Sequence, residues 1–464
     1  MYKFDIDILA DINFSKALQN ILRKKIYSKS SLFHNSQVTD DNLVESVPLV
    51  KVSKRKILLN YLLYSLVLIM YFINIFRLPP RNKARSVILI FSLTKDQAIR
   101  NKSLKSLNTF LDSKGITNDS QSQVLIETRT FLFNRRHNLT KTTFDIPFRI
   151  YASDFSFGKK LQSWVSMCKR FKKIMKLQRT HGFFSLILKE FIFDEIVYTA
   201  CNSNYFEKLI TTPSQIAYQP LIFEYDNILS KKLMIWYSAN SNPLEYKKDT
   251  ERFMINPTVF KNIRVDEHWV WTNENKIFLS TLTRAKILVK KSLMFYEADG
   301  KSIFGQELDV LIFDSTPFAD ANVTKGSIYT AKEIIKFIDE ILLITEDLRK
   351  KFGVHHRVYL KNKRKQSRYH SIEYRNYLSE KVKSKEIILV PYNVNLYDLI
   401  KECKLVIGYP FTSPVIIGKE LNKPSVFYCS SKLLKQVPKK DNVLFIQNRT
   451  SLFNYIEKSL RITQ

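Results

Sequence analysis

The feature that most constrains the fold is a regular alternation of short apolar runs and amphipathic stretches between Leu308 and Tyr428. Runs such as LDVLIF, EIILV and KLVIG are each followed by a polar turn and then by a helix-like stretch, the longest of which ends at Gly353. Strands that alternate with helices in this way form a mostly parallel sheet with right-handed crossovers. Because ligands of such sheets bind outside the carboxyl ends of the strands, the residues after each apolar run are the first candidates for a site.

The first half of the chain contains the same kinds of element in a less regular order. A first strand is predicted at SVILIF, which follows Arg85, and a second at Gln123–Phe133. Two helices rich in aromatic and basic residues are predicted at Lys159–Leu177 and Phe183–Cys201, and a further strand at Lys232–Pro243. The stretch DEHWVWTNENKIFLSTL, which begins at Asp266, is expected to cross between the halves. We therefore predict an α/β protein with two Rossmann-like domains facing a cleft, at residues 84–262 and 263–464, behind an N-terminal lead-in at residues 1–83.

A hydrophobic segment, Ile57–Phe76, lies within this lead-in and has no charged residue in 20 positions. A helix of that length can cross a hydrocarbon core of about 30 Å. Basic residues flank both ends, and Asn60, Ser65 and Asn74 interrupt the apolar run. Three readings stay open, namely a single span, a monotopic helix in the interface and a helix buried against protein. Membrane association is the favoured outcome.

The composition is strongly basic, with 74 Lys and Arg against 43 Asp and Glu and a formal net charge of +31. Such a field attracts nucleic acid, anionic headgroups or phosphorylated substrates. The four cysteines are scattered without a CxxC pair, which indicates neither a disulfide framework nor a zinc site. No secretory signal is recognisable in the first 20 residues.

Hydroxyl-bearing and basic residues follow several predicted strands of the second half. Parallel strands bring such loops to one edge of a sheet, where cations, hydroxyls and the amides of a helix N-terminus suit a phosphate or pyrophosphate group. The residues predicted to bind phosphate are Lys361, Lys363, Arg364, Phe411, Thr412 and Ser413. The neighbouring loop holds Asp314, Ser315 and Thr316. Helix capping by Thr412 or Ser413 is the competing interpretation, and the two roles are compatible.

The string IGYPFTSPVIIGKELNKPSVFY resembles the signature of the polysaccharide biosynthesis proteins named for their PFTS motif, and FDSTP, VYLKNKR and WYSANSNP are similar to companion segments of that group. The resemblance implies a glycosyltransferase of the GT-B type that builds a bacterial surface or capsular polysaccharide. The layout is also similar to bacterial sialyltransferases and Kdo transferases, which implies a CMP-linked donor. Where those enzymes carry a Lys-Pro-His-Pro-like string, this chain has Lys361-Asn362-Lys363-Arg364, so UDP and GDP donors stay open.

Further residues are candidates for other parts of the site. Glu420 is a candidate for the donor ribose, and Asp314 either orients its loop, which we favour, or contacts the sugar. The acceptor side is expected to include Trp236, Tyr237 and Asn240. The acids available as a catalytic base are Asp154, Glu224 and Asp226, and the sequence does not rank them.

The predicted reaction uses a nucleotide sugar as its co-substrate and needs no cofactor and no metal. The expected partners are that donor, a lipid-linked or glycan acceptor and an anionic membrane surface, at the cytoplasmic face of the bacterial inner membrane. One alternative is a polyol-phosphate transferase of the teichoic-acid type, and another is a non-catalytic partner of a polysaccharide assembly machine. A nucleic-acid binder is disfavoured, because the basic and aromatic stretches fall on helices and form no known binding module.

Overall fold

The computed structural model describes residues 54–76, 87–91, 104–117, 123–128, 141–142, 150–151, 155–178, 188–212, 221–224, 228–238, 263–317, 328–362, 367, 370–431, 433–435, 439–440 and 442–461. The chain forms two compact units, one built mainly from Leu9–Ile235 and the other mainly from Trp269–Gln464.

The first sheet has the strand order β3-β2-β1-β4-β5-β6-β7, and the pairs from β3 to β5 are parallel. Its first five strands are β1 (Val87–Phe91), β2 (Gln123–Thr128), β3 (Lys141–Thr142), β4 (Phe206–Thr211) and β5 (Lys231–Ile235). The stretch after Asp266 does not simply cross between halves. It forms β6 (Glu267–Val270), α10 (Asn273–Ser280) and β7 (Lys286–Val289), and both strands join the first sheet. All four residues of β6 are buried.

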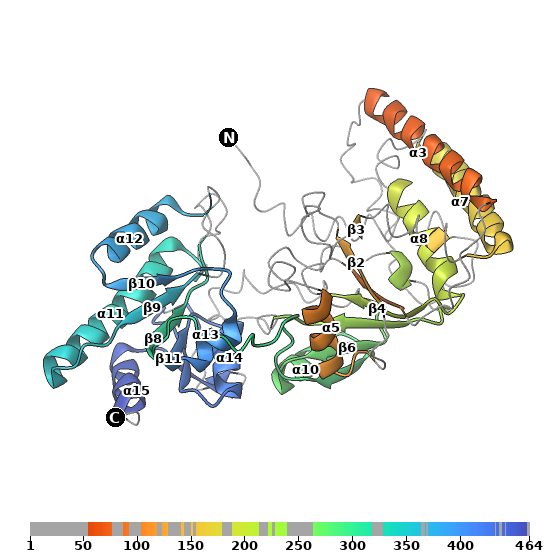
Figure 1. Ribbon diagram of the computed structural model, residues 1–464. Helices are drawn as coiled ribbons and strands as arrows, with labels where there is room; N and C mark the ends of the chain where they lie inside the picture. Colours follow the sequence, from red (N-terminus) through yellow and green to blue (C-terminus); the bar gives the residue numbers. More distant parts are fainter. Residues whose placement is uncertain are drawn as a thin grey trace. The chain divides into compact units, whose positions relative to one another are not determined.

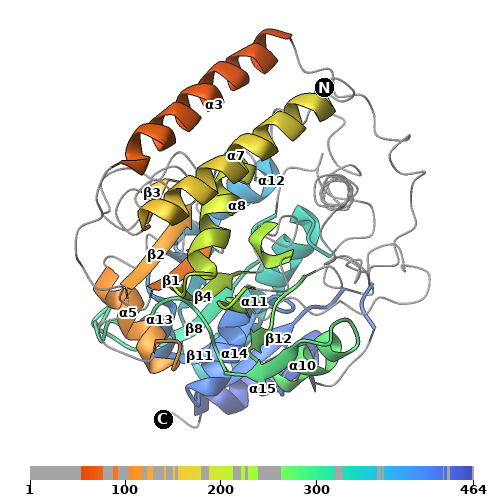
Figure 2. The same cartoon turned by 90° about the vertical axis from the view of Figure 1, so that its right-hand side faces the viewer.

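The helices that accompany the first sheet are α3 (Lys54–Ile75), α5 (Leu104–Ser113), α7 (Phe157–Gln178), α8 (Leu188–Cys201) and the 3-10 turn η4 (Leu221–Glu224). Helices α3 and α7 lie side by side in both views (Figures 1 and 2). The hydrophobic segment of the sequence is therefore a helix, as expected, and it packs against α7. Among the described helices, none combines the length and the apolar character needed to cross a membrane.

The second sheet has the order β10-β9-β8-β11-β12-β14-β13. Its strands are β8 (Leu308–Phe313), β9 (Val358–Lys361), β10 (Ile387–Val390), β11 (Cys403–Gly408), β12 (Ser425–Tyr428), β13 (Lys439–Lys440) and β14 (Val443–Ile446). All pairs except β13 with β14 are parallel. The chain winds outward from β8 in one direction and then returns to add β11 on the other side. The direction of winding thus reverses between β8 and β11, which is where open α/β sheets place their ligands.

The helices of this unit are α11 (Ala331–Phe352), α12 (Ile372–Lys383), α13 (Leu396–Lys401), α14 (Ser413–Glu420) and α15 (Arg449–Arg461). Helix α11 shows how the sequence sets their ends. Thr330 accepts a hydrogen bond from the Glu333 amide at the start, and Gly353 ends the helix with a left-handed backbone at φ 73°. A threonine cap and a glycine in this conformation are the expected end signals, and the predicted end at Gly353 is confirmed.

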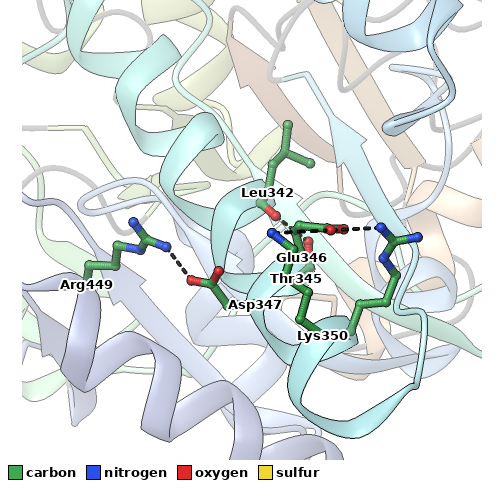
Figure 3. Close-up of polar contacts among 7 residues, drawn as sticks. Leu342, Thr345, Glu346, Asp347, Lys350 and Arg449 are labelled. Atoms are coloured by element: carbon green, nitrogen blue, oxygen red, sulfur yellow. Dashed lines mark hydrogen bonds and ion pairs between the residues drawn. The ribbon is translucent and has the colours of Figure 1, made fainter.

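Ion pairs on the surface of α11 add little to this framework. Glu346 forms ion pairs with Arg349 and Lys350. Asp347 pairs with Arg449 of α15 (Figure 3). The Arg349 guanidinium hydrogen-bonded to Glu346 lowers the pKa of that carboxyl. Because these side chains face solvent, such pairs contribute little to the stability of the fold. Packing of the apolar faces therefore holds α11 and α15 in place.

A buried histidine in β6 predicts a pH-dependent stability. Burial lowers the pKa of His268 from 6.5 to about 4. Between these values the unfolded chain binds a proton that the folded chain does not, so the free energy of unfolding falls as the pH drops below about 6.5. We expect a loss of roughly 2–3 kcal/mol by pH 4 from this group. His268→Gln should remove this part of the slope in urea denaturation, whereas the exposed His355→Gln should keep it. Equal slopes in both variants would contradict the assignment.

Candidate functional site

The site predicted from the sequence lies along the carboxyl edge of the second sheet, where four strands end level with one another. Phe313 of β8 pairs with Gly408 of β11 on one side and with Lys361 of β9 on the other, and Lys361 in turn pairs with Val390 of β10. The loops after these strands therefore share one rim, as the alternation of strands and helices predicted. The reversal of winding between β8 and β11 lies in the middle of that rim.

Helix α14 begins almost in contact with the end of β11. A Cβ atom at Gly408 would lie 2.1 Å from a methyl carbon of Val415 and 2.6 Å from the hydroxyl oxygen of Thr412. Real Cβ atoms do not approach other heavy atoms that closely. Only glycine at this position allows the first turn of α14 to fold back over the end of the strand. The N-terminus of the helix is thereby brought to the rim.

Thr412 occupies the N-cap position of α14 but does not cap the helix. Its side chain accepts no hydrogen bond from the first turn, and it is 6% exposed. The hydroxyl oxygen has no hydrogen-bond partner in the described part of the chain. A buried polar atom without a partner costs about 1–3 kcal/mol. Helix capping therefore does not explain the Thr412 hydroxyl, which is buried without a hydrogen-bond partner among the described residues.

Ser413, the first residue of α14, lies next to a serine from the other half of the sequence. Its hydroxyl is 3.1 Å from the hydroxyl of Ser238, which follows β5 in the segment WYSANSNP. Within that segment, Trp236 is buried, and its carbonyl accepts a hydrogen bond from the indole of Trp271. Tyr237 is half-buried, and Asn240 lies outside the described residues. Sequence reasoning named the neighbours of Ser238 but missed Ser238 itself, because a lone serine after an aromatic pair carries no distinct signal.

Phe411 fixes the loop from the apolar side. Its ring makes edge contacts with Phe427 of β12 and Phe445 of β14 at centroid distances of 5.2 Å each. At 8% exposure, the ring belongs to the core under the rim. The predicted phosphate-binding role of Phe411 stays a prediction, and its ring packs in the core next to Thr412.

The loop after β8 is braced by a buried carboxylate. Asp314 is 1% exposed and accepts hydrogen bonds from the hydroxyls of Tyr374 in α12 and Thr316. Burial, with the Asp314 carboxylate as a second cause, raises the pKa of Tyr374 well above its usual value. The phenol therefore stays protonated and donates to Asp314. Ser315, which lies between Asp314 and Thr316 in the sequence, is half-buried in the same loop.

The end of β9 presents one buried cation and one buried amide. The ammonium of Lys361 donates to the carbonyl of Tyr392 at 2.7 Å, and the side chain is 2% exposed. Asn362 is 4% exposed, and its amide oxygen has no partner in the described part of the chain. The predicted Lys363 and Arg364 lie outside the described residues. A second polar atom without a partner thus lies on this edge of the sheet, two strands away from β11.

A histidine that the sequence did not single out follows a few residues later. His370 is 3% exposed, and its Nδ1 atom accepts a hydrogen bond of 2.9 Å from the amide of Ser367. The next residue, Ser371, donates its amide to the carbonyl of Pro317 in the loop after β8. His370 thus lies beside that loop. His370 lies nine positions after the end of β9, so no short motif marked it.

Glu420 lies at the far end of α14. Its carboxylate accepts a hydrogen bond of 3.2 Å from the amide of Ser292, and the hydroxyl of Ser292 lies 2.9 Å from that of Tyr397. Glu420 therefore ties the segment after β7 to α14. The candidate bases of the first half cannot be placed in the same way. Asp154, Asp226 and the side chain of Glu224 lie outside the described part.

Two sheets with helices between their strands, the second with polar residues along its edge at the reversal of winding, define this chain as an α/β protein. The chain belongs to the family of polysaccharide biosynthesis PFTS motif proteins, whose family model matches residues 172–456, more than half of its 464 residues. The matched range contains every described residue of the rim. No curated protein matches the chain.

Solved structures to which the chain is similar include TarM, with a TM-score of 0.44, 10% identity, and coverage of 82% of this chain and 92% of that chain. The wall teichoic acid polymerase TagF has a TM-score of 0.42 and 9% identity, over 89% of this chain and 91% of that chain. UDP-GlcNAc 2-epimerase from Methanocaldococcus jannaschii has a TM-score of 0.40 and 10% identity, over 81% and 93% of the two chains.

The close approach at β11 predicts a specific effect of one methyl group. Gly408→Ala should destabilise the fold by about 2 kcal/mol or more, because α14 must move away from the strand to make room. Gly158→Ala is the matched control, since no atom lies within 4 Å of the added Cβ and the position is helical. It should be neutral or stabilising by up to about 1 kcal/mol. Urea denaturation measures both, and similar midpoints for the two variants would contradict the assigned contact.

Proposed function

We propose that this chain is a glycosyltransferase of polysaccharide biosynthesis that holds the phosphate of a nucleotide-sugar donor at the rim of the second sheet. The observation that carries the proposal is the buried Thr412 hydroxyl without a partner at the start of α14. Helix N-termini favour anions through their amides and dipole. A phosphate oxygen would accept the hydrogen bond that Thr412 has to give.

The family to which the chain belongs supports the class of reaction, since its members are described as polysaccharide biosynthesis proteins. In the proposed step an acceptor hydroxyl attacks the anomeric carbon of the donor sugar. The bond from that carbon to the phosphate oxygen breaks, and the nucleotide leaves with the bonding electrons. The proton of the hydroxyl passes to a base for which Asp154, Glu224 and Asp226 stay candidates.

The rim supplies what the leaving nucleotide needs. Negative charge builds up on the phosphate as the glycosidic bond breaks, and preorganised donors in a water-poor site stabilise it. Thr412, Ser413 and the start of α14 provide such donors, and Lys361, Lys363 and Arg364 provide positive charge at the end of β9. We propose that this arrangement acts without a metal or a further cofactor. Glu420 stays a candidate for the ribose, and Ser315 and Thr316 for the sugar.

CMP-linked sugars are the first donor class to test, because of the likeness to sialyltransferases and Kdo transferases. The acceptor we propose is a lipid-linked or growing glycan at the cytoplasmic face of the bacterial inner membrane. Nucleotide sugars are available on that side.

Thr412→Val separates the proposed ligand role from a structural one. Valine keeps the shape and removes the hydroxyl that has no partner, so the variant should be as stable as the parent or more stable by about 1 kcal/mol. It should also lose most of the stabilisation by nucleotide. Thermal unfolding of the full chain with CMP, CDP, UDP, GDP and ADP measures both effects, since a ligand that binds only the native state raises its stability.

Thr345→Val is the matched control for this substitution. The Thr345 hydroxyl donates to the carbonyl of Leu342 at 2.8 Å within α11 (Figure 3), so its loss should cost about 1 kcal/mol and leave nucleotide binding unchanged. Unchanged nucleotide binding by Thr412→Val would contradict the phosphate site. Selective stabilisation by CMP would support a CMP-linked donor, and preference for UDP or GDP would redirect the proposal to those sugars. Binding without transfer to any acceptor would contradict the enzymatic role.

A further inference from the structure

Helix α3 has two apolar faces, and one of them is buried against the described part of the chain while the other is exposed. Tyr64, Leu68, Tyr71 and Ile75 are buried at 2–8% exposure. The helix also exposes large apolar side chains at 51–60%, namely Leu58, Leu62, Leu66, Ile69, Met70 and Ile73. With about 100° per residue, the exposed set lies on the side of α3 opposite to the buried set.

Contacts with α7 fix which side of α3 faces outward. The indole of Trp164 donates to the carbonyl of Leu68 at 3.1 Å, and the buried ammonium of Lys160 lies 3.3 Å from the carbonyl of Asn74. Both donors come from α7 and reach backbone carbonyls of α3. A hydrogen-bonded side chain at each of two turns prevents α3 from rotating, so the exposed apolar side is a fixed part of the surface.

The exposed apolar surface continues from α3 onto α7. The rings of Phe76 and Phe157 lie 6.2 Å apart, and those of Phe72 and Trp164 lie 4.9 Å apart. Further exposed apolar side chains of α7 are Leu161, Val165 and Met175, at 37–40%. Contacts that pair the end of α3 with the start of α7 show that the helices are antiparallel, and Figure 2 shows them side by side. The two helices form one apolar surface, which we call the α3–α7 face.

The charges of these two helices have one sign. Helix α7 carries seven Lys or Arg residues and no Asp or Glu, and α3 also has no acid. Lys159, Lys169 and Lys172 of α7 are exposed. An apolar stripe combined with cations and no acids is the pattern of helices that lie in the interface of an anionic bilayer, where apolar side chains enter the acyl boundary and cations meet headgroups.

We propose that the α3–α7 face docks in the plane of an anionic phospholipid membrane, with both helices lying in the interface. This proposal rests on the proposed function, whose acceptor lies at a membrane. It specifies which surface of the protein meets the membrane and which lipid charge that surface prefers. A second copy of the chain fits less well. In a two-fold dimer the same patch meets itself, so Lys169 and Lys172 would face the same cations of the other copy, whereas anionic headgroups neutralise them.

The test is flotation of the full chain with vesicles of phosphatidylcholine alone or mixed with phosphatidylglycerol. The parent should bind the mixed vesicles more tightly, and added salt should reduce the difference. Leu66→Glu/Ile69→Glu should reduce partitioning by about tenfold or more, since burying one such side chain already has that effect. Ile277→Glu/Leu343→Glu is the matched control. It adds the same charge at exposed apolar positions of α10 and α11, which are 66% and 49% exposed, and should bind as the parent does.

Milder variants separate loss of folding from loss of binding. If the Leu66→Glu/Ile69→Glu variant does not fold, Leu66→Gln/Ile69→Gln should show the same loss of vesicle binding in a folded chain. Lys169→Gln/Lys172→Gln should keep binding to neutral vesicles and lose the preference for phosphatidylglycerol. Absence of vesicle binding by the parent, or equal binding by the Leu66/Ile69 variants and the control, would overturn the proposal. A parent chain that binds no vesicles but forms a dimer in sedimentation, with the dimer abolished in the Leu66/Ile69 variants, would assign the face to a second copy and overturn the proposal.

The same samples keep this proposal distinct from the nucleotide site. Leu66→Glu/Ile69→Glu should retain the full thermal stabilisation by nucleotide, whereas Thr412→Val should retain vesicle binding. If the parent chain binds vesicles but no nucleotide, the proposed function is contradicted and the membrane face stands. If the parent binds nucleotide but no vesicles, the membrane face is contradicted and the proposed function stands.

Discussion

The contact between the end of β11 and the start of α14 is the constraint on which the site depends. Because residue 408 is glycine, the first turn of α14 lies within 2.6 Å of where a Cβ atom would be. Phe411 packs into the core beside it, at 8% exposure, and Thr412 is buried with a hydroxyl that has no partner in the described part of the chain. A buried polar atom of this kind lowers stability. Its place at the reversal of strand winding, where open α/β sheets bind their ligands, is what the proposed donor site rests on.

Bracing on both sides keeps the rim rigid. Asp314 and Tyr374 tie the loop after β8 to α12, and Lys361 ties the end of β9 to the carbonyl of Tyr392. Glu420 joins the other end of α14 to Ser292. Each of these polar groups is matched by a partner within its own unit. The unmatched atoms on this edge, in Thr412 and Asn362, stand out against that background.

The sequence predicted those parts of the fold that follow from local periodicity. The strands and helices from Leu308 to Tyr428 were foreseen, because each apolar run is bounded by turn residues and Gly353 marks a helix end. Strands β13 and β14 near the end of the chain were not predicted. The short strand β6 was missed, since EHWV contains a glutamate and a histidine, and only tertiary pairing buries them. Ser238 and His370 were missed because their place at the site depends on contacts between segments far apart in the chain. The segment at α3 could be recognised as hydrophobic, but its two faces depend on α7, which no pattern within α3 reveals.

The most direct test of the central claim is a crystal structure of the full chain with the nucleotide that stabilises it best. The account predicts a phosphate oxygen within hydrogen-bond distance, about 2.5–3.0 Å, of the Thr412 hydroxyl at the start of α14. A well-defined nucleotide bound elsewhere, with the Thr412 hydroxyl still without a partner, would contradict it.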